Sequence, residues 1–235
     1  MNTRETDIRA GTTTGAQAAT LHYIFDPLCG WCYAASPLIR EVVDTASSNL
    51  TLQFHPGLLF ASEREIDMSY REHIISADQR IAALAGVSFG DAYIKRVRNA
   101  QHLWYHSAPP AAAIMAVAAL QPESALNMLE AIQHAHYVLG EDVTDATHLQ
   151  QLAVSVGVAA EVFDSAFNVA LEYLPQQAEV ARALLQASGG GGFPTFVLSA
   201  NDRQIRLDHG SAYGKPDLMI ASLNRALQEL ATQAP

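Results

Sequence analysis

Residues 26–38 read DPLCGWCYAASPL and contain both cysteines of this 235-residue chain, Cys29 and Cys32. Two cysteines at this spacing are compatible with a structural disulfide, a metal site or a redox-active dithiol. A disulfide between them would close almost no loop, so it would restrict the unfolded chain very little. A zinc site would need two further soft ligands, and the chain has no third cysteine. The residues therefore favour the dithiol, and no metal is expected.

The segments on both sides of this pair predict a mixed fold. Apolar residues alternate over residues 21–25 and 51–55, as in strands, and a helical pattern begins between them at the cysteines. Near the other end, residues 194–200 and 204–208 predict two more strands, and a final helix follows. Neither end can bury a sheet alone, so we expect one α/β domain built from a β-α-β half and a β-β-α half.

Between these halves lies a long block whose pattern is almost wholly helical. Its apolar residues recur at helical spacing, and glycines and prolines separate the segments. The predicted helices are residues 69–84, 90–101, 110–120, 124–139, 146–156 and 161–186. The last of these contains Pro175, where it could break.

Charge and hydropathy exclude several classes of partner. The formal net charge of −10 repels phosphate backbones, so we do not expect nucleic acid as a partner. Residues 1–20 are polar and contain no apolar run of signal-peptide length, and no stretch elsewhere is long enough to span a bilayer. We therefore expect a cytoplasmic protein without membrane association. A durable disulfide is not the expected resting state in that reducing compartment.

A helix that begins near Cys29 gives this residue a distinct chemistry. The first N–H groups of a helix have no partner within it and lie at the positive end of its dipole, so they favour a thiolate. Cys29 is therefore the predicted nucleophile, and Cys32, one turn further along, is shielded and attacks second. Gly30 and Trp31 both keep their N–H groups as donors. Trp31 could equally be a packed aromatic residue.

Two stretches, FDPLCGWCYAASP and GGGGFPTFVL, together resemble the DsbA-like family of thioredoxin-fold oxidoreductases, in its protein disulfide isomerase branch. The shared features are a CxxC that opens a helix, Pro37 within that helix, a distant Phe-Pro-Thr and a helical insertion. The resemblance covers residues 21–232. It implies a thioredoxin fold with a large all-helical domain inserted between its halves. The implied parts are a disordered arm of residues 1–20, a discontinuous thioredoxin-like domain of residues 21–61 and 188–233, and an inserted domain of residues 62–187.

The resemblance also assigns roles to Phe193, Pro194 and Thr195. In the family this loop faces the disulfide, and the bond before the proline is cis. The backbone of Phe193 would then be free to pair with an extended substrate peptide beside the nucleophile. Pro37 would kink the first helix and aim its first turn at the substrate. The alternative is that this helix stops at Ser36 and a second one begins.

Asp26 is a candidate proton relay during exchange, because it lies three residues before Cys29. Asp-Pro is also a common turn starter, so a purely structural role is open. The position six residues before the nucleophile, where the family more often has an acid, is Tyr23 in this chain. The residues therefore leave two interpretations of Asp26.

The leading hypothesis is a thiol–disulfide oxidoreductase or isomerase that exchanges disulfides with protein or peptide thiols through Cys29 and Cys32. It needs no cofactor, although glutathione could serve as reductant. One alternative is a glutathione-dependent enzyme of the 2-hydroxychromene-2-carboxylate isomerase or kappa-class transferase type, and another is a non-catalytic peptide-binding protein. Those glutathione enzymes usually carry a single serine or cysteine, so the presence of Cys32 favours the leading hypothesis. We expect the helical block to cap the Cys29 surface; the oligomeric state is not predicted.

Overall fold

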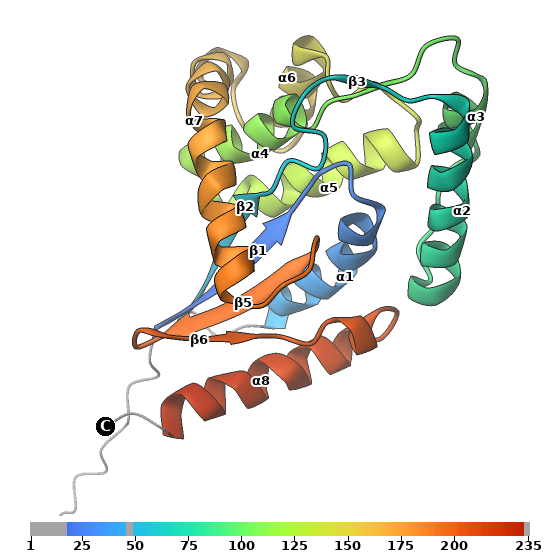
Figure 1. Ribbon diagram of the computed structural model, residues 1–235. Helices are drawn as coiled ribbons and strands as arrows, with labels where there is room; N and C mark the ends of the chain where they lie inside the picture. Colours follow the sequence, from blue (N-terminus) through green and yellow to red (C-terminus); the bar gives the residue numbers. More distant parts are fainter. Residues whose placement is uncertain (1–17, 46–48, 233–235) are drawn as a thin grey trace, which may run out of the picture.

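A four-stranded sheet lies at the centre of the computed structural model, which describes residues 18–45 and 49–232 (Figure 1). The strand order is β2-β1-β5-β6. Strand β1 pairs in parallel with β2 and antiparallel with β5, and β6 continues antiparallel from β5. The strands are β1 (Ala19–Phe25), β2 (Leu50–Pro56), β5 (Thr195–Ala200) and β6 (Arg203–Arg206). The two predicted halves therefore build one sheet.

Residues 1–17 of the predicted N-terminal arm lie outside the described part of the chain. The first strand begins at Ala19, two residues earlier than predicted, and Ala19 is buried. Pairing with β2 reaches this residue, since Ala19 lies opposite Leu50 in the parallel register. The last two residues of the predicted arm are thus part of the sheet.

Eight α-helices surround the sheet in the described residues. They are α1 (Gly30–Thr45), α2 (Met68–Ala85), α3 (Asp91–Asn99), α4 (Ala108–Leu120), α5 (Ala125–Tyr137), α6 (Ala146–Ser155), α7 (Ala160–Ala187) and α8 (Pro216–Thr232). Each predicted helix of the long block is present. Asp67 caps α2 by accepting a hydrogen bond from the Tyr70 N–H, and Gly86 ends the helix in the left-handed region.

The two faces of the sheet have different covers. Leu21, Tyr23 and Phe25 of β1 belong to the main core, to which α1 and α8 contribute buried residues. Ile24, on the opposite face, packs with Ala181 of α7 in a separate small cluster. This division follows from the alternation of side chains along a strand.

The inserted block is not wholly helical, which corrects the prediction. Strand β3 (Arg64–Glu65) pairs antiparallel with β4 (Trp104–Tyr105) where the block leaves the sheet domain. Two residues per strand are too few to leave an alternating pattern in the sequence, so the prediction missed this pair. Ile66 follows β3 and ties the same two segments together, because its N–H donates to the carbonyl of Leu103.

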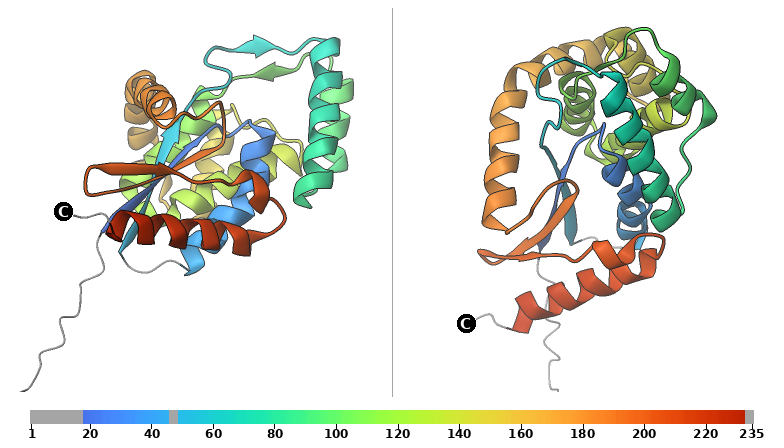
Figure 2. Two further views of the ribbon diagram at one scale, coloured as in Figure 1. Left: turned by 60° about the horizontal axis from the view of Figure 1, so that its bottom comes forward. Right: turned by 45° about the vertical axis from the view of Figure 1, so that its right-hand side comes forward.

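Helix α7 continues through Pro175 and does not break there, although its axis changes direction along its length (Figure 2). A proline removes one backbone hydrogen bond and crowds the preceding turn, which bends a helix without ending it. The first half of α7 packs on α4, and the second half covers the sheet. The domain boundary at residue 187 stays a prediction.

Candidate active site

Both cysteines lie at the N-terminal end of α1. The helix begins at Gly30, and the Tyr33 N–H donates to the carbonyl of Cys29 at 3.0 Å. Cys29 is 8% exposed and Cys32 is fully buried, so the expected shielding of Cys32 is confirmed. Both are free thiols. Burial and the neighbouring Cys29 thiol raise the pKa of Cys32 well above its ordinary value, so Cys32 keeps its proton near neutral pH.

The loop that contains Phe193 and Pro194 lies directly beside Cys29. The Cys29 thiol donates to the Phe193 carbonyl at 3.6 Å, although 164 residues separate the two in the chain. The Phe193–Pro194 peptide bond is cis. Thr195 supports the loop, since its hydroxyl donates to the Gly192 carbonyl at 2.8 Å.

Because Gly57 has no side chain, the Phe193 ring can pack directly against its backbone. A Cβ added at Gly57 would stand 2.0 Å from an atom of that ring, far inside van der Waals contact. The Gly57 N–H also donates to the carbonyl of Phe25, at the end of β1. The end of β2 and the returning loop therefore fit together only with glycine at this position.

Asp26 lies behind Cys32 and is fully buried. Its carboxylate accepts hydrogen bonds from the N–H groups of Leu28 at 2.8 Å and Leu59 at 2.7 Å, and its own N–H donates to the Cys32 sulfur at 3.5 Å. Burial raises the pKa of Asp26 above its ordinary value. Tyr23 is close as well, because its hydroxyl donates to the Cys32 carbonyl at 3.5 Å. The structure places Asp26 beside Cys32, and its role as a proton relay stays a prediction.

Two other predicted residues of the motif have clear positions. Helix α1 runs unbroken through Pro37, so the alternative that it stops at Ser36 is wrong. Trp31 is half-buried, its ring centroid lies 5.1 Å from that of Tyr213, and the Tyr213 hydroxyl donates to its carbonyl at 3.2 Å. Trp31 is therefore a packed aromatic residue that also lines the cavity beside Cys29.

We call the cavity next to Cys29 the thiol cavity; its volume is about 430 Å³. Its wall combines both parts of the chain. The sheet domain contributes Leu28, Cys29, Gly30, Trp31 and Phe193, and the inserted block contributes Tyr70, His73, Asp78, Arg80, Tyr93, Tyr105 and Tyr137, among others. The prediction that a helix of the inserted block lies beside the active-site groove is confirmed.

The sequence analysis predicted none of the inserted-block residues of this wall, and Asp78 is the buried acidic residue among them. Its carboxylate accepts a hydrogen bond from the Tyr93 hydroxyl at 2.8 Å, and burial raises the pKa of Asp78 to about 7. A Cβ added at Gly30 would stand 2.8 Å from Asp78 Oδ1, so a larger residue there would displace the carboxylate or the start of α1. A signal was present in the sequence, because Ile75, Asp78 and Ile81 follow one another at the spacing of a buried helical stripe.

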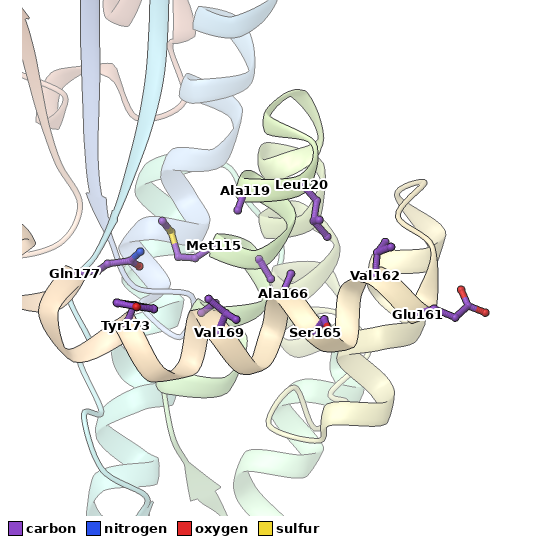
Figure 3. A pocket seen from close by; sticks show the side chains of 12 residues that line it. Met115, Ala119, Leu120, Glu161, Val162, Ser165, Ala166, Val169, Tyr173 and Gln177 are labelled. Carbon is purple, nitrogen blue, oxygen red and sulfur yellow. The ribbon is translucent and has the colours of Figure 1, made fainter.

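A larger hollow, the α4–α7 groove, has no cysteine in its lining (Figure 3). Its volume is about 610 Å³. Apolar side chains dominate its lining, which includes Met115, Leu120, Val162, Val169 and Tyr173. Tyr173 and Val169 are about half exposed.

Metal and membrane chemistry find no support in the described part of the chain. No three His, Cys, Asp or Glu side chains gather there as a set that could bind a metal ion. No helix among these residues has the length and hydropathy needed to cross a bilayer.

Comparison with known proteins gives the family. Residues 20–212 match the DSBA-like thioredoxin domain. The chain belongs to this family. Its thioredoxin fold and its predicted resemblance are thereby confirmed, and the family's chemistry is thiol–disulfide oxidoreduction. The chain matches no curated protein sequence.

Solved structures similar to this DSBA-like chain include the cytosolic disulfide reductase DsbM from Pseudomonas aeruginosa, with 36% identity and a TM-score of 0.80 over 89% of this chain and 98% of that one. The same protein with GSH gives 35% identity and a TM-score of 0.79, over 89% of this chain and 99% of that one. A 2-hydroxychromene-2-carboxylate isomerase shares 12% identity, with a TM-score of 0.54 over 92% of this chain and 100% of that one. This last likeness shows a shared fold alone.

Proposed function

We propose that this protein reduces disulfides of proteins or peptides in the cytosol through Cys29 and Cys32, with glutathione as the electron donor. The observation that carries the proposal is the arrangement of the two thiols. Cys29 opens onto the thiol cavity beside the Phe193 carbonyl, and Cys32 lies buried one turn behind it. The similarity to a cytosolic disulfide reductase, one structure of which contains GSH, supports the direction and the donor.

The proposed cycle has two halves. Cys29, as thiolate, attacks one sulfur of a substrate disulfide, and the other sulfur leaves as a thiol after taking up a proton. Cys32 then attacks the mixed disulfide at Cys29 and releases the second substrate thiol, so the enzyme is left oxidised. Two glutathione thiols reduce the Cys29–Cys32 disulfide and leave as glutathione disulfide. Each half transfers two electrons.

The thiol cavity suits a small peptide thiol. Its volume of about 430 Å³ lies within the range of roughly 300 to 1,000 Å³ typical of ligand pockets. Polar groups on its wall, such as Arg80 and the tyrosine hydroxyls, can bind peptide carboxylates and carbonyls. The small-molecule isomerase alternative rests on fold likeness alone, and it gives no role to Cys32.

Mass spectrometry of two single variants with glutathione disulfide tests the proposal. Cys32→Ser should accumulate a mixed disulfide between Cys29 and glutathione, because the resolving thiol is absent. Cys29→Ser should form none at the same protein and glutathione concentrations. A protein disulfide such as that of insulin should be reduced by the wild type only, with glutathione supplied. The proposal fails if Cys32→Ser reduces the protein disulfide at the wild-type rate, or if the wild type does not exchange with glutathione.

A further inference from the structure

Asp78 is a charged group of the thiol cavity that the exchange steps above do not use. Its residue exposure is 7%, and it lies on α2, in the inserted block. The Tyr93 hydroxyl donates to Oδ2, and Oδ1 has no hydrogen-bond partner among the described residues. Oδ1 is therefore the carboxylate oxygen whose negative charge no hydrogen bond from a described residue offsets.

Asp78 lies at the end of α1 where Cys29 is found, and both residues line the thiol cavity. Oδ1 lies 2.8 Å from the place of a Cβ on Gly30, and Gly30 is the first residue of that helix. The carboxylate thus rests against the backbone that directly follows Cys29. The unpaired N–H groups and the dipole of α1 attract both a carboxylate and a thiolate here, while two negative charges at one helix end disfavour each other.

Little positive charge opposes this carboxylate. No ion pair involves Asp78 within the described residues. The titratable or charged groups that share the cavity with it are Tyr70, His73 and Arg80 of α2, Tyr93 of α3, Tyr105 of β4, Tyr137 of α5 and Cys29. The two potential cations, His73 and Arg80, are exposed, so water and salt screen them.

We propose that the Asp78 carboxylate opposes the negative charge of a Cys29 thiolate and thereby makes the Cys29–Cys32 couple more reducing. This inference rests on the redox function proposed above. A less stable thiolate means a less stable reduced form, and a dithiol whose reduced form is less stable gives up its electrons more readily. Asp78 touches no reacting atom, so it is a positioning residue that acts through Cys29.

Protons balance in the step that Asp78 influences. Two glutathione thiols give two electrons to the Cys29–Cys32 disulfide, leave as glutathione disulfide and release two protons. Cys32 takes one proton, because burial raises its pKa. The second proton goes to Cys29 or, where Cys29 stays a thiolate, to the solvent. Asp78 is a carboxylate above its pKa, which burial raises to about 7. The effect of the carboxylate is therefore full well above pH 7 and fades below it.

The test is a redox equilibrium in glutathione buffers at pH 8 and pH 6. Asp78→Asn keeps the shape and the Tyr93 partner but removes the charge. The equilibrium constant for its reduction by glutathione should rise by about 3- to 10-fold over the wild type at pH 8. At pH 6 the rise should be less than about twofold, because Asp78 is then protonated in the wild type. Glu72→Gln, which removes an exposed carboxylate from the same helix, should match the wild type at both pH values.

An unchanged constant at pH 8, or an equal change at both pH values, overturns the inference. If Asp78→Asn does not fold, Tyr93→Phe tests the effect of the Asp78 charge on the redox equilibrium instead. The Tyr93 hydrogen bond lowers the pKa of Asp78, so its loss should make the couple more oxidising than the wild type at pH 7 but not at pH 9; equal constants at pH 7 overturn the inference. If the wild type does not equilibrate with glutathione, the proposed function fails instead.

Discussion

Two hollows of this protein, the α4–α7 groove and the thiol cavity, differ in size and in chemistry. The larger, the α4–α7 groove, has a volume of about 610 Å³ and a mainly apolar lining without a cysteine (Figure 3). The thiol cavity, at about 430 Å³, contains Cys29 and the ionisable side chains of Asp78 and Tyr93. The reactive groups therefore occupy the smaller of these two hollows. The start of α1 and the loop that contains Phe193 define the reactive site, and the volume of a hollow does not indicate where that site lies.

Cys29→Ser should have the largest effect, because it removes the nucleophile from the thiol cavity. A serine hydroxyl ionises far less readily than a thiol, so reduction of a protein disulfide should slow by about 1,000-fold or more. The measurement is the initial rate with glutathione supplied. Tyr173→Ser, in the α4–α7 groove, is the matched control and should keep the wild-type rate. If Cys29→Ser slowed the reduction less than tenfold, the thiol cavity would not be the hollow in which the reaction takes place.

Asp78→Asn should show that the thiol cavity makes the stability of the protein depend on pH. The pKa of Asp78 is about 7 in the folded protein and 3.8 ordinarily, so between these values the folded chain binds a proton that the unfolded chain releases. The contribution of Asp78 to wild-type stability therefore falls as the pH rises from 4 to 7. The variant lacks this loss, and its stability relative to the wild type should improve by about 2 to 4 kcal/mol between pH 4 and pH 8.

Urea denaturation of both proteins at the two pH values gives this difference, and groups common to both chains cancel. Glu161→Gln, in the α4–α7 groove, should show no such change. A constant difference between Asp78→Asn and the wild type across this range would mean that Asp78 is ionised in the folded protein even at acidic pH.

Gly30→Ala should slow exchange by about tenfold, because its Cβ would stand 2.8 Å from Asp78 Oδ1 and displace either the carboxylate or the start of α1. The measurement is kcat/KM for a protein disulfide. A double variant, Gly30→Ala with Asp78→Ala, should recover most of the loss, since the obstructing carboxylate is gone. Additive losses in the double variant would show that Gly30 matters for another reason.

Val169→Ser with Tyr173→Ser should have the smallest effect. Both side chains are about half exposed on the α4–α7 groove. The rate of disulfide reduction should stay within about twofold, and the free energy of unfolding should change by about 0.5 kcal/mol or less per site. A large loss of rate with intact stability would show that the groove takes part in substrate binding.

Much of the sheet domain could be predicted from the sequence because its signals are local. Alternation over residues 21–25 and 51–55 gave the parallel strands, and the spacing of Cys29 and Cys32 gave the dithiol at the start of α1. The position of Phe193 came from the family resemblance, since no local pattern places residue 193 beside residue 29. The pairing of β3 with β4 was missed because its strands have two residues each.

Asp78 was missed for a different reason. A charged residue within a helix is ordinarily assigned to the solvent side, and only its place in the stripe with Ile75 and Ile81 argues otherwise. Even that stripe indicates burial without naming the neighbour. The contact with Gly30 joins segments 48 residues apart, and it depends on how α2 packs against α1, which no local rule determines.

Helix α7 has a consequence for protein engineering. Its first half belongs to the wall of the α4–α7 groove, and its second half covers Ile24 and Val197 on the sheet. One continuous helix thus packs against both the inserted block and the sheet domain. Removing residues 62–187 as an exchangeable module would expose one face of the sheet to water, because it removes all but Phe193 of the residues that cover that face. A graft between family members therefore needs a junction inside α7, near Pro175.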